Sequence, residues 1–276
     1  MKKIIYDFGA NNGDNIEYYL LKSDLLVIVE ANPRLCNLIR KKFKQEIYNK
    51  KLIVENCILT SDVSETLQQF YIHKENHLLS QFPRPDDKYI NNFYIEKISS
   101  KKVTNIIKEY GDPYYVKIDI ENYDHAILYE LLNNKIIPDY ISAEANTLDI
   151  FCTLVSLGNY KSFKLVNGED VHIIYQNTQI ETLNGLKNFK FVKNSAGPFG
   201  NDINGPWITS DNFFYLLAKE KLGWKDIHCS KIDHPEINKN YLKYYDRKKA
   251  IKKKIIKILK KIIRIFKKID FFKKFI

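Results

Sequence analysis

The sequence predicts an α/β protein built on a doubly wound, mostly parallel sheet. Two observations predict this fold: strand-like apolar runs alternate with helical runs along most of the chain, and several of the strand-like runs end in an acidic residue. Strands that alternate with helices favour a parallel sheet covered by helices on both faces. The 276 residues suit one large domain with an appendage.

The regular elements can be placed in order along the chain. Strands are expected at residues 2–8, 25–32, 51–59, 114–120 and 138–145. Helices are expected at residues 14–22, 33–43, 103–111, 123–134 and 148–159. Pro33 stands at the start of one helix, and Gly111 ends another, as the conformational preferences of these residues favour.

Three segments are less regular. Residues 61–100 carry many polar residues and are interpreted as an excursion over one sheet edge that could act as a lid. Residues 194–207 hold three glycines and two prolines, which is typical of a loop that either grips an acceptor or simply turns. Residues 211–224 fit a helix or a strand equally well.

The segment DFGANNG, residues 7–13, lies where the first strand turns into its helix. In open parallel sheets, ligands bind beyond the carboxyl ends of the strands. Gly9 and Gly13 have the spacing G-x-x-x-G, which is neither the dinucleotide fingerprint G-x-G-x-x-G nor a P-loop. Glu30 ends the second strand, where an acid commonly binds ribose hydroxyls. The pattern favours a nucleoside ligand without a pyrophosphate, and S-adenosylmethionine is the common one.

Polar side chains also follow the other strands. Asn56 and Cys57 lie towards the end of the third strand, where a nucleoside base is expected, and Asp119 and Glu121 end the fourth. Glu144 ends the fifth. Because parallel strands end at one edge of the sheet, these acids are expected to gather there.

These motifs, taken together, resemble the FkbM-type S-adenosylmethionine-dependent methyltransferases. The matching segments are, in order, DFGANNGDN, VEANP, ENCIL, VKIDIENYDHAIL, ISAEAN, LGNYKSFKLVN and SAGPFGNDINGPW. The resemblance implies a Rossmann-like class I methyltransferase fold, whose seven-stranded sheet has a reversed last strand, and O-methyl transfer as the activity. It departs from the family at Asn122, which stands where the family's D-x-E-G motif has glycine; asparagine tolerates positive φ better than most residues.

The cofactor and catalytic residues follow from the strand ends and from the resemblance. The expected S-adenosylmethionine-binding residues are Asp7, Gly9, Ala10, Asn11, Gly13, Glu30, Ala31, Asn32, Asn56, Cys57 and Asp119.

Asp119 and Glu144 are the first candidates for removing the acceptor's proton, and Glu121 is the third, although Glu121 could instead cap the helix that begins near Tyr123. Two routes stay open: one acid acts as general base, or Asp119 and Glu144 hold a divalent cation. The route without metal is favoured because no third acid for a cage is evident.

The acceptor class rests on the family alone. The family's tendency to methylate sugars implies a sugar or glycan hydroxyl. The alternatives are a lipid, a small natural product, or a non-catalytic relative that binds a membrane surface. The sequence leaves the oligomeric state open.

The net charge of +11 comes from the end of the chain. Residues 243–276 hold 15 Lys/Arg and 2 Asp/Glu, which leaves 29 basic and 31 acidic residues before them. The near-neutral body argues against nucleic acid as a partner. The dispersed cysteines Cys36, Cys57, Cys152 and Cys229 are expected to be reduced in a cytoplasmic protein.

The chain is divided into a methyltransferase domain at 1–225, a connecting segment at 226–245 and a basic amphipathic helix at 246–276. One face of this helix is apolar, through Ile251, Ile255, Ile258, Ile262, Ile265, Ile269 and Phe272. Lysines fill the other face, which suits an anionic membrane surface, on the inner face of the membrane. The alternatives are docking on the catalytic domain, a partner helix or nucleic acid.

Overall fold

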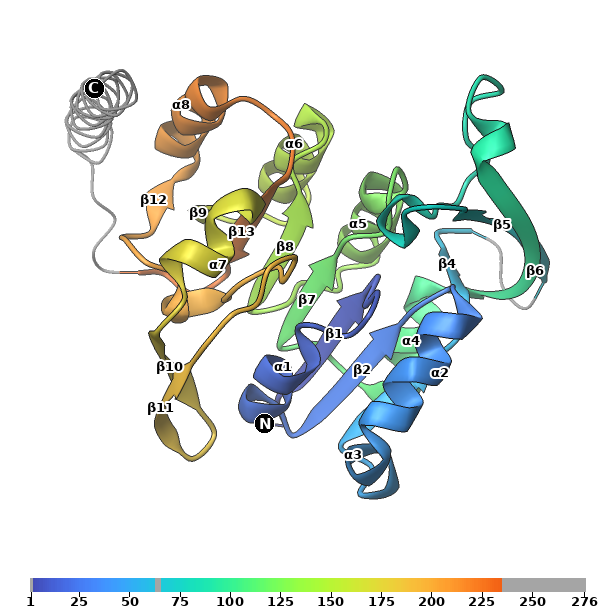
Figure 1. Cartoon of the computed structure of the whole chain (residues 1–276). Coiled ribbons are helices and arrows are strands. Elements are labelled where there is room, and N and C mark those ends of the chain that lie inside the picture. Colours follow the sequence, from blue (N-terminus) through green and yellow to red (C-terminus); the bar gives the residue numbers. More distant parts are fainter. Residues whose placement is uncertain (1, 63–65, 235–276) are drawn as a thin grey trace, which may run out of the picture.

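The structure, a computed structural model, describes residues 2–62 and 66–234. Its main element is an eight-stranded sheet at the centre of the molecule, covered by helices on both faces (Figure 1). From one edge to the other the strands are β12 (Ile208–Thr209), β9 (Ser162–Asn167), β13 (Lys225–Ser230), β8 (Tyr140–Glu144), β7 (Tyr115–Ile118), β1 (Ile4–Phe8), β2 (Leu25–Val29) and β3 (Leu52–Glu55).

The direction of the strands confirms the predicted fold. β3, β2, β1, β7 and β8 are parallel to one another, and β13 is inserted antiparallel between β8 and β9. The seven longer strands therefore form the sheet with one reversed strand that the family resemblance implied. The two-residue β12 adds to it, antiparallel to β9.

Alternating side chains of the buried strands face two separate cores. In β1, Tyr6 and Phe8 pack in one core and Ile5 packs in the other. The first core is covered by α4 (Val103–Tyr110), α5 (Asp124–Asn133), α6 (Leu148–Ser156) and α8 (Ser210–Glu220). The second is covered by α1 (Ile16–Lys22), α2 (Pro33–Lys42) and the short α7 (Val171–Ile174), and α3 (Lys44–Tyr48) follows α2.

The predicted third strand is in fact two strands in different sheets. β3 ends at Glu55, and β4 (Ile58–Thr60) pairs with β6 (Phe93–Lys102), which also pairs with β5 (Leu67–His73). The chain leaves the main sheet at Asn56, whose side-chain amide donates to the backbone oxygens of Glu30 at 2.9 Å and Ala31 at 3.0 Å. The expected excursion is thus a three-stranded sheet with 3₁₀ turns at His77–Leu79 and Ile90–Asn92. In Figure 1 its strands β5 and β6 lie at the right, to the right of α5.

Between residues 178 and 230 the structure shows which segments are helix, strand and loop. Residues 211–220 lie in helix α8, and the sheet extends through Ser230, five residues past the suggested boundary at 225, because β13 forms backbone pairs with both β8 and β9. A hairpin of β10 (Thr178–Thr182) and β11 (Gly185–Phe189) precedes the loop at 194–207. Asp202 in that loop accepts hydrogen bonds from Tyr18 and Lys22 of α1, at 2.7 and 2.6 Å.

Within residues 2–62 and 66–234, no helix combines the length and the apolar character needed to cross a membrane. The predicted connecting segment beyond residue 234 and the predicted basic helix at 246–276 lie outside the described residues.

Candidate active site

A cavity of about 530 Å³ lies beyond the carboxyl ends of β1, β2, β7 and β8. Of the predicted residues, those that line it are Gly9, Ala10, Asn11, Glu30, Ala31, Cys57, Asp119, Glu121 and Glu144. The excursion contributes Phe82 and the turn at His77–Leu79, and the loop after β11 contributes Ser195 and its neighbours. The structure therefore brings the predicted cofactor side and the predicted catalytic side into one space.

The turn after β1 depends on the two predicted glycines. Gly9 has φ +85°, and a Cβ there would lie 1.7 Å from the backbone oxygen of Asp119. Gly13 has φ +80°, and its Cβ would lie 2.8 Å from the Ile16 side chain. Both positions need glycine, because a side chain would strain the backbone and clash. This turn brings the β1 loop directly against the end of β7.

Glu30 joins the β1 loop to the β2 loop. One oxygen of its carboxylate accepts the backbone N–H of Asn11 at 2.8 Å, and the other accepts that of Asn32 at 2.7 Å. Burial raises the pKa of Glu30 to about 7. The carboxylate is therefore oriented by backbone donors on the cavity wall, while its other lone pairs can accept from a ligand.

Three predicted cofactor residues support the cavity wall instead of lining it. The Asn32 side chain accepts the backbone N–H of Arg34 and so caps α2. Asn56 holds the β2 loop through the two carbonyls given above. Gly13 packs beneath α1 and α2.

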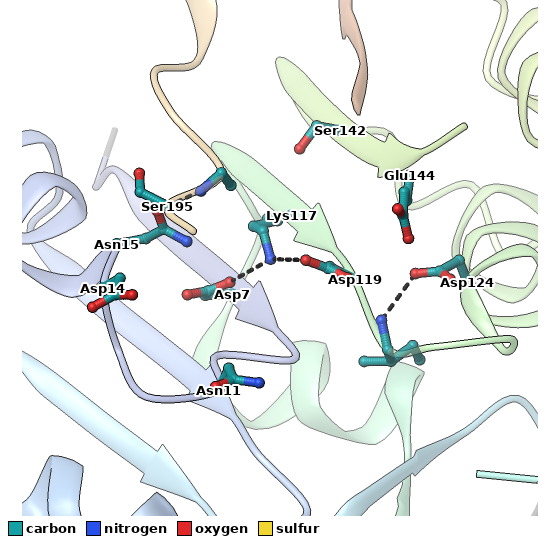
Figure 2. A network of polar contacts seen from close by, with 12 residues as sticks. Asp7, Asn11, Asp14, Asn15, Lys117, Asp119, Asp124, Ser142, Glu144 and Ser195 are labelled. Atoms are coloured by element: carbon teal, nitrogen blue, oxygen red, sulfur yellow. Dashed lines mark hydrogen bonds and ion pairs between the residues drawn. The ribbon is translucent and has the colours of Figure 1, made fainter. Parts of the chain in front are cut away.

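Asp7, the fourth predicted cofactor residue that does not line the cavity, lies in a buried ion cluster that the sequence did not reveal. Lys117 of β7 lies between two acids, with its Nζ 2.9 Å from Asp119 and 3.7 Å from Asp7 (Figure 2). Both Asp7 oxygens are buried without a hydrogen bond, and burial raises the pKa of Asp7. Burial alone would lower the pKa of Lys117, but Asp119 and Asp7 outweigh it and raise that pKa. Lys117 is therefore a cation that balances the acids around it.

Three carboxylates meet at the cavity floor beside this lysine. Ligand oxygens of Asp119, Glu121 and Glu144 lie within 4.8 Å of one another. Burial, then the Asp119 charge, raises the pKa of Glu121 to about 8 and that of Glu144 to about 7. The expectation that no third acid completes a cation cage was wrong, because the turn after β7 directs Glu121 towards the other two.

That turn has unusual backbone angles. Glu121 has φ 42° and Asn122 has φ 65°, so asparagine adopts the positive φ that the family's glycine would. Asp124 stabilises the turn by accepting the Ile120 N–H at 3.0 Å (Figure 2). Glu121 makes no capping bond to α5, so its predicted alternative as a cap is not observed. His125 of α5 is not part of the acid cluster, and its Nε2 lies 2.9 Å from the Thr153 hydroxyl of α6.

Two further cavity residues come from distant segments. Asp226 of β13 lies opposite Glu144 in the strand register, and Trp224 precedes the same strand. Burial raises the pKa of Asp226. No local motif marks either residue, because Asp226 lies in a strand of mixed polar and apolar residues, KDIHCS, late in the chain.

No protein-family model matches the chain, and no curated protein matches it by sequence. Among solved structures it is similar to methyltransferase FkbM from Methylobacillus flagellatus, with 15% identity and a TM-score of 0.40 over 60% of this chain and 40% of that one. The chain thus spans less than half the length of that structure.

Two other solved structures match more of their own length. A precorrin-6y C5,15-methyltransferase from Geobacter metallireducens shows 12% identity and a TM-score of 0.38, over 84% of this chain and 81% of that one. An O-methyltransferase from Bacillus cereus in complex with SAH shows 9% identity and a TM-score of 0.36, over 83% and 74%.

The fold itself is defined by the order of the seven longer strands and by the reversal of β13 between β8 and β9. By this topology the chain has a Rossmann-like α/β fold, and the solved structures similar to it include a methyltransferase FkbM, of the family that its sequence resembles.

Proposed function

We propose that this protein is an S-adenosylmethionine-dependent O-methyltransferase that methylates a hydroxyl of a sugar or glycan intermediate. One observation carries the proposal: a single cavity joins the Gly9 turn and the Glu30 carboxylate to the acids at the ends of β7 and β8. The first part suits a nucleoside and the second suits deprotonation of an acceptor.

The cofactor side fits the nucleoside by shape and by charge. The Gly9 turn leaves the backbone bare, so a ligand can approach it closely. Glu30 would accept the ribose hydroxyls, and the apolar wall of Leu59 and Phe70 would cover the base. Bound S-adenosylmethionine supplies the methyl group on a positively charged sulfur, which the surrounding acids would stabilise.

Glu144 is the proposed general base. Lys117 pairs with Asp119, so of the three clustered acids Glu144 and Glu121 have no cation at hydrogen-bond distance among the described residues. Bound S-adenosylmethionine would supply the methyl group to the acceptor oxygen and leave as S-adenosylhomocysteine, and Glu144 would take the proton of the acceptor hydroxyl. A base with a pKa near 7 is well matched to this step.

A divalent cation held by Asp119, Glu121 and Glu144 is the second candidate for activating the hydroxyl. The 4.8 Å cluster has the oxygen donors that hard cations prefer. Such a cation would polarise the hydroxyl directly and would relieve the repulsion among the three acids. Lys117 already neutralises part of this charge, which favours the route without metal.

The membrane partner rests on the sequence of residues 246–276. A basic amphipathic helix on an anionic surface would bring the cavity to membrane-linked glycans. Deleting residues 247–276 should release the protein from vesicles that contain phosphatidylglycerol, while S-adenosylmethionine binding is kept. Vesicle binding that survives the deletion would refute this part of the proposal.

Calorimetric titration with S-adenosylmethionine tests the cofactor assignment. We expect binding by the wild type and a loss of at least about tenfold in affinity for Glu30→Ala, because the ribose would lose charge-assisted hydrogen bonds. Glu17→Ala is the control, because Glu17 forms an exposed ion pair with Lys42 outside the cavity. A wild-type protein that binds no S-adenosylmethionine would overturn the proposed function. Methyl transfer that EDTA abolishes and Mn²⁺ restores would favour the cation route over the Glu144 base.

A further inference from the structure

Trp224 is a large aromatic side chain left exposed at the rim of the cavity. Its side chain and backbone are 48% exposed, whereas Trp207, the other tryptophan, is 5% exposed. Trp224 lines the cavity together with Glu144 and Asp226. None of the ring–ring contacts in residues 2–62 and 66–234 includes it. The indole is therefore available to a ligand.

The indole is held in place by a glycine on the neighbouring strand connection. A Cβ at Gly168 would lie 2.5 Å from both Cε2 and Nε1 of Trp224, so only glycine lets the ring lie against the backbone there. The backbone on either side is fixed as well. Gly168 N–H donates to the Trp224 oxygen at 3.1 Å, and Gly223 N–H donates to the Ala145 oxygen at 3.1 Å. One part of the ring thus rests on main chain.

The strand register brings the backbone on both sides of Trp224 next to the end of β8, where the proposed base Glu144 lies. Ala145 N–H donates to the Lys225 oxygen at 2.7 Å, and Asp226 lies opposite Glu144. Trp224 lies in the bend directly before β13, and Asp226 is the second residue of that strand. Both side chains line the cavity. An acceptor resting on the indole would have its polar groups at Glu144 and Asp226.

We propose that Trp224 is the platform on which the acceptor sugar ring stacks, with Gly168 as the residue that sets the angle of the indole. The inference rests on the proposed function and specifies its substrate class. An aromatic face attracts the polarised C–H bonds of a pyranose ring, while the hydroxyls at the ring edge stay free for acids. A flat apolar support beside several carboxylates matches a ligand that has both features.

Methyl transfer to a panel of methyl α-glycosides of glucose, mannose, galactose and fucose tests this assignment. For any glycoside that is methylated, Trp224→Ala should raise KM roughly tenfold, whereas Trp224→Phe, which keeps a ring, should stay within about threefold of the wild type. Affinity for S-adenosylmethionine should change in neither variant. Gly168→Val should act like Trp224→Ala, because it displaces the indole. Tyr215→Ala removes an exposed aromatic of α8 outside the cavity and is the matched control.

Tryptophan fluorescence gives a readout that needs no turnover. With S-adenosylhomocysteine added, a bound glycoside should change the wild-type emission saturably, and Trp224→Phe should abolish the change while Trp207 still emits. The inference is overturned if Trp224→Ala leaves the KM for the glycoside unaffected. It is also overturned if none of the glycosides in the panel produces a change in emission that depends on Trp224. If the wild type still binds S-adenosylmethionine, the proposed methyltransferase function is not affected by either of these results. Failure of the Trp224 inference can therefore be told apart from failure of the proposed function.

Discussion

The two sides of the cavity are built in different ways. On the side proposed for the cofactor, here called the cofactor side, the main chain forms the cavity wall: the Gly9 turn approaches β7, and two N–H groups orient Glu30. On the side proposed for the acceptor, here called the acceptor side, side chains come from separate segments, with Glu121 after β7, Glu144 at the end of β8 and Asp226 on β13. The cofactor side is therefore a backbone cradle, formed by the Gly9 turn and by the two N–H groups that orient Glu30. The acceptor side is a group of carboxylates, and the charge of each one affects the pKa of the others.

The largest expected effect is on the backbone cradle. Gly9→Ala would place a Cβ 1.7 Å from the Asp119 oxygen, so β1 and β7 would have to separate at the cavity. We expect S-adenosylmethionine affinity to fall by more than about 100-fold, because the cavity loses its shape. Calorimetric titration measures this affinity, and circular dichroism verifies that the variant is folded.

Gly205→Ala is the control for the backbone strain of that change. Gly205 has φ +88°, like Gly9, but a Cβ there would have no atom within 4 Å. It should cost about 1 kcal/mol of stability and leave binding unchanged. Equal binding losses in the two variants would mean that strain, not the close approach to β7, explains the result.

The second expected effect is on the acceptor side and concerns rate. Glu144→Gln keeps the shape of the side chain but removes its ability to accept a proton. We expect kcat to fall by about 10²–10⁴-fold with S-adenosylmethionine affinity unchanged. In the wild type, kcat should rise as the pH increases through about 7, since the base must be ionised. A variant with wild-type kcat would show that Glu144 is not the base.

The contrast between the two sides also explains what the sequence could predict. The proposed cofactor side is made of short motifs such as DFGANNG, so its candidate residues could be predicted from the sequence. Lys117 carries charge inside a strand that is otherwise apolar, Asp226 lies in a strand of mixed polar and apolar residues, and only the strand order brings them to the acids. β9 and β13 were not predicted individually, because buried polar residues such as Lys164 and His228 interrupt their apolar pattern. Lys164 is accommodated by donating to the Ile203 oxygen at 2.6 Å, a partner 39 residues away.

The third expected effect is a pH dependence of stability. The pKa of Glu121 is raised from 4.5 to about 8 in the folded protein, so between these values the folded state binds a proton that the unfolded state has released. The free energy of unfolding should therefore fall as the pH rises from 4.5 to 8. Glu121→Gln should flatten this dependence and be more stable than the wild type at pH 8. Urea unfolding at a series of pH values, with EDTA present, measures the free energy of unfolding. If this free energy depends on pH equally in the variant and in the wild type, the burial of Glu121 beside the other acids is contradicted.

The smallest expected effect is on the cofactor side and tests whether side chains outside the cavity contribute to S-adenosylmethionine affinity. Asn56 donates to the backbone oxygens of Glu30 and Ala31 and so fixes the β2 loop from outside the cavity. Asn56→Ala should weaken S-adenosylmethionine binding about fivefold, equivalent to about 1 kcal/mol, because the loop loses two supports but Glu30 keeps its two N–H donors.

Asn134→Ala is the matched control for that change, since its amide also donates two hydrogen bonds, both to Glu130 at the exposed end of α5. It should leave binding unchanged. If Asn56→Ala instead weakened binding as much as Gly9→Ala, the backbone turn would not be sufficient to form the cradle. The cofactor side would then depend on distant side chains as the acceptor side does, and the distinction between the two sides would fail.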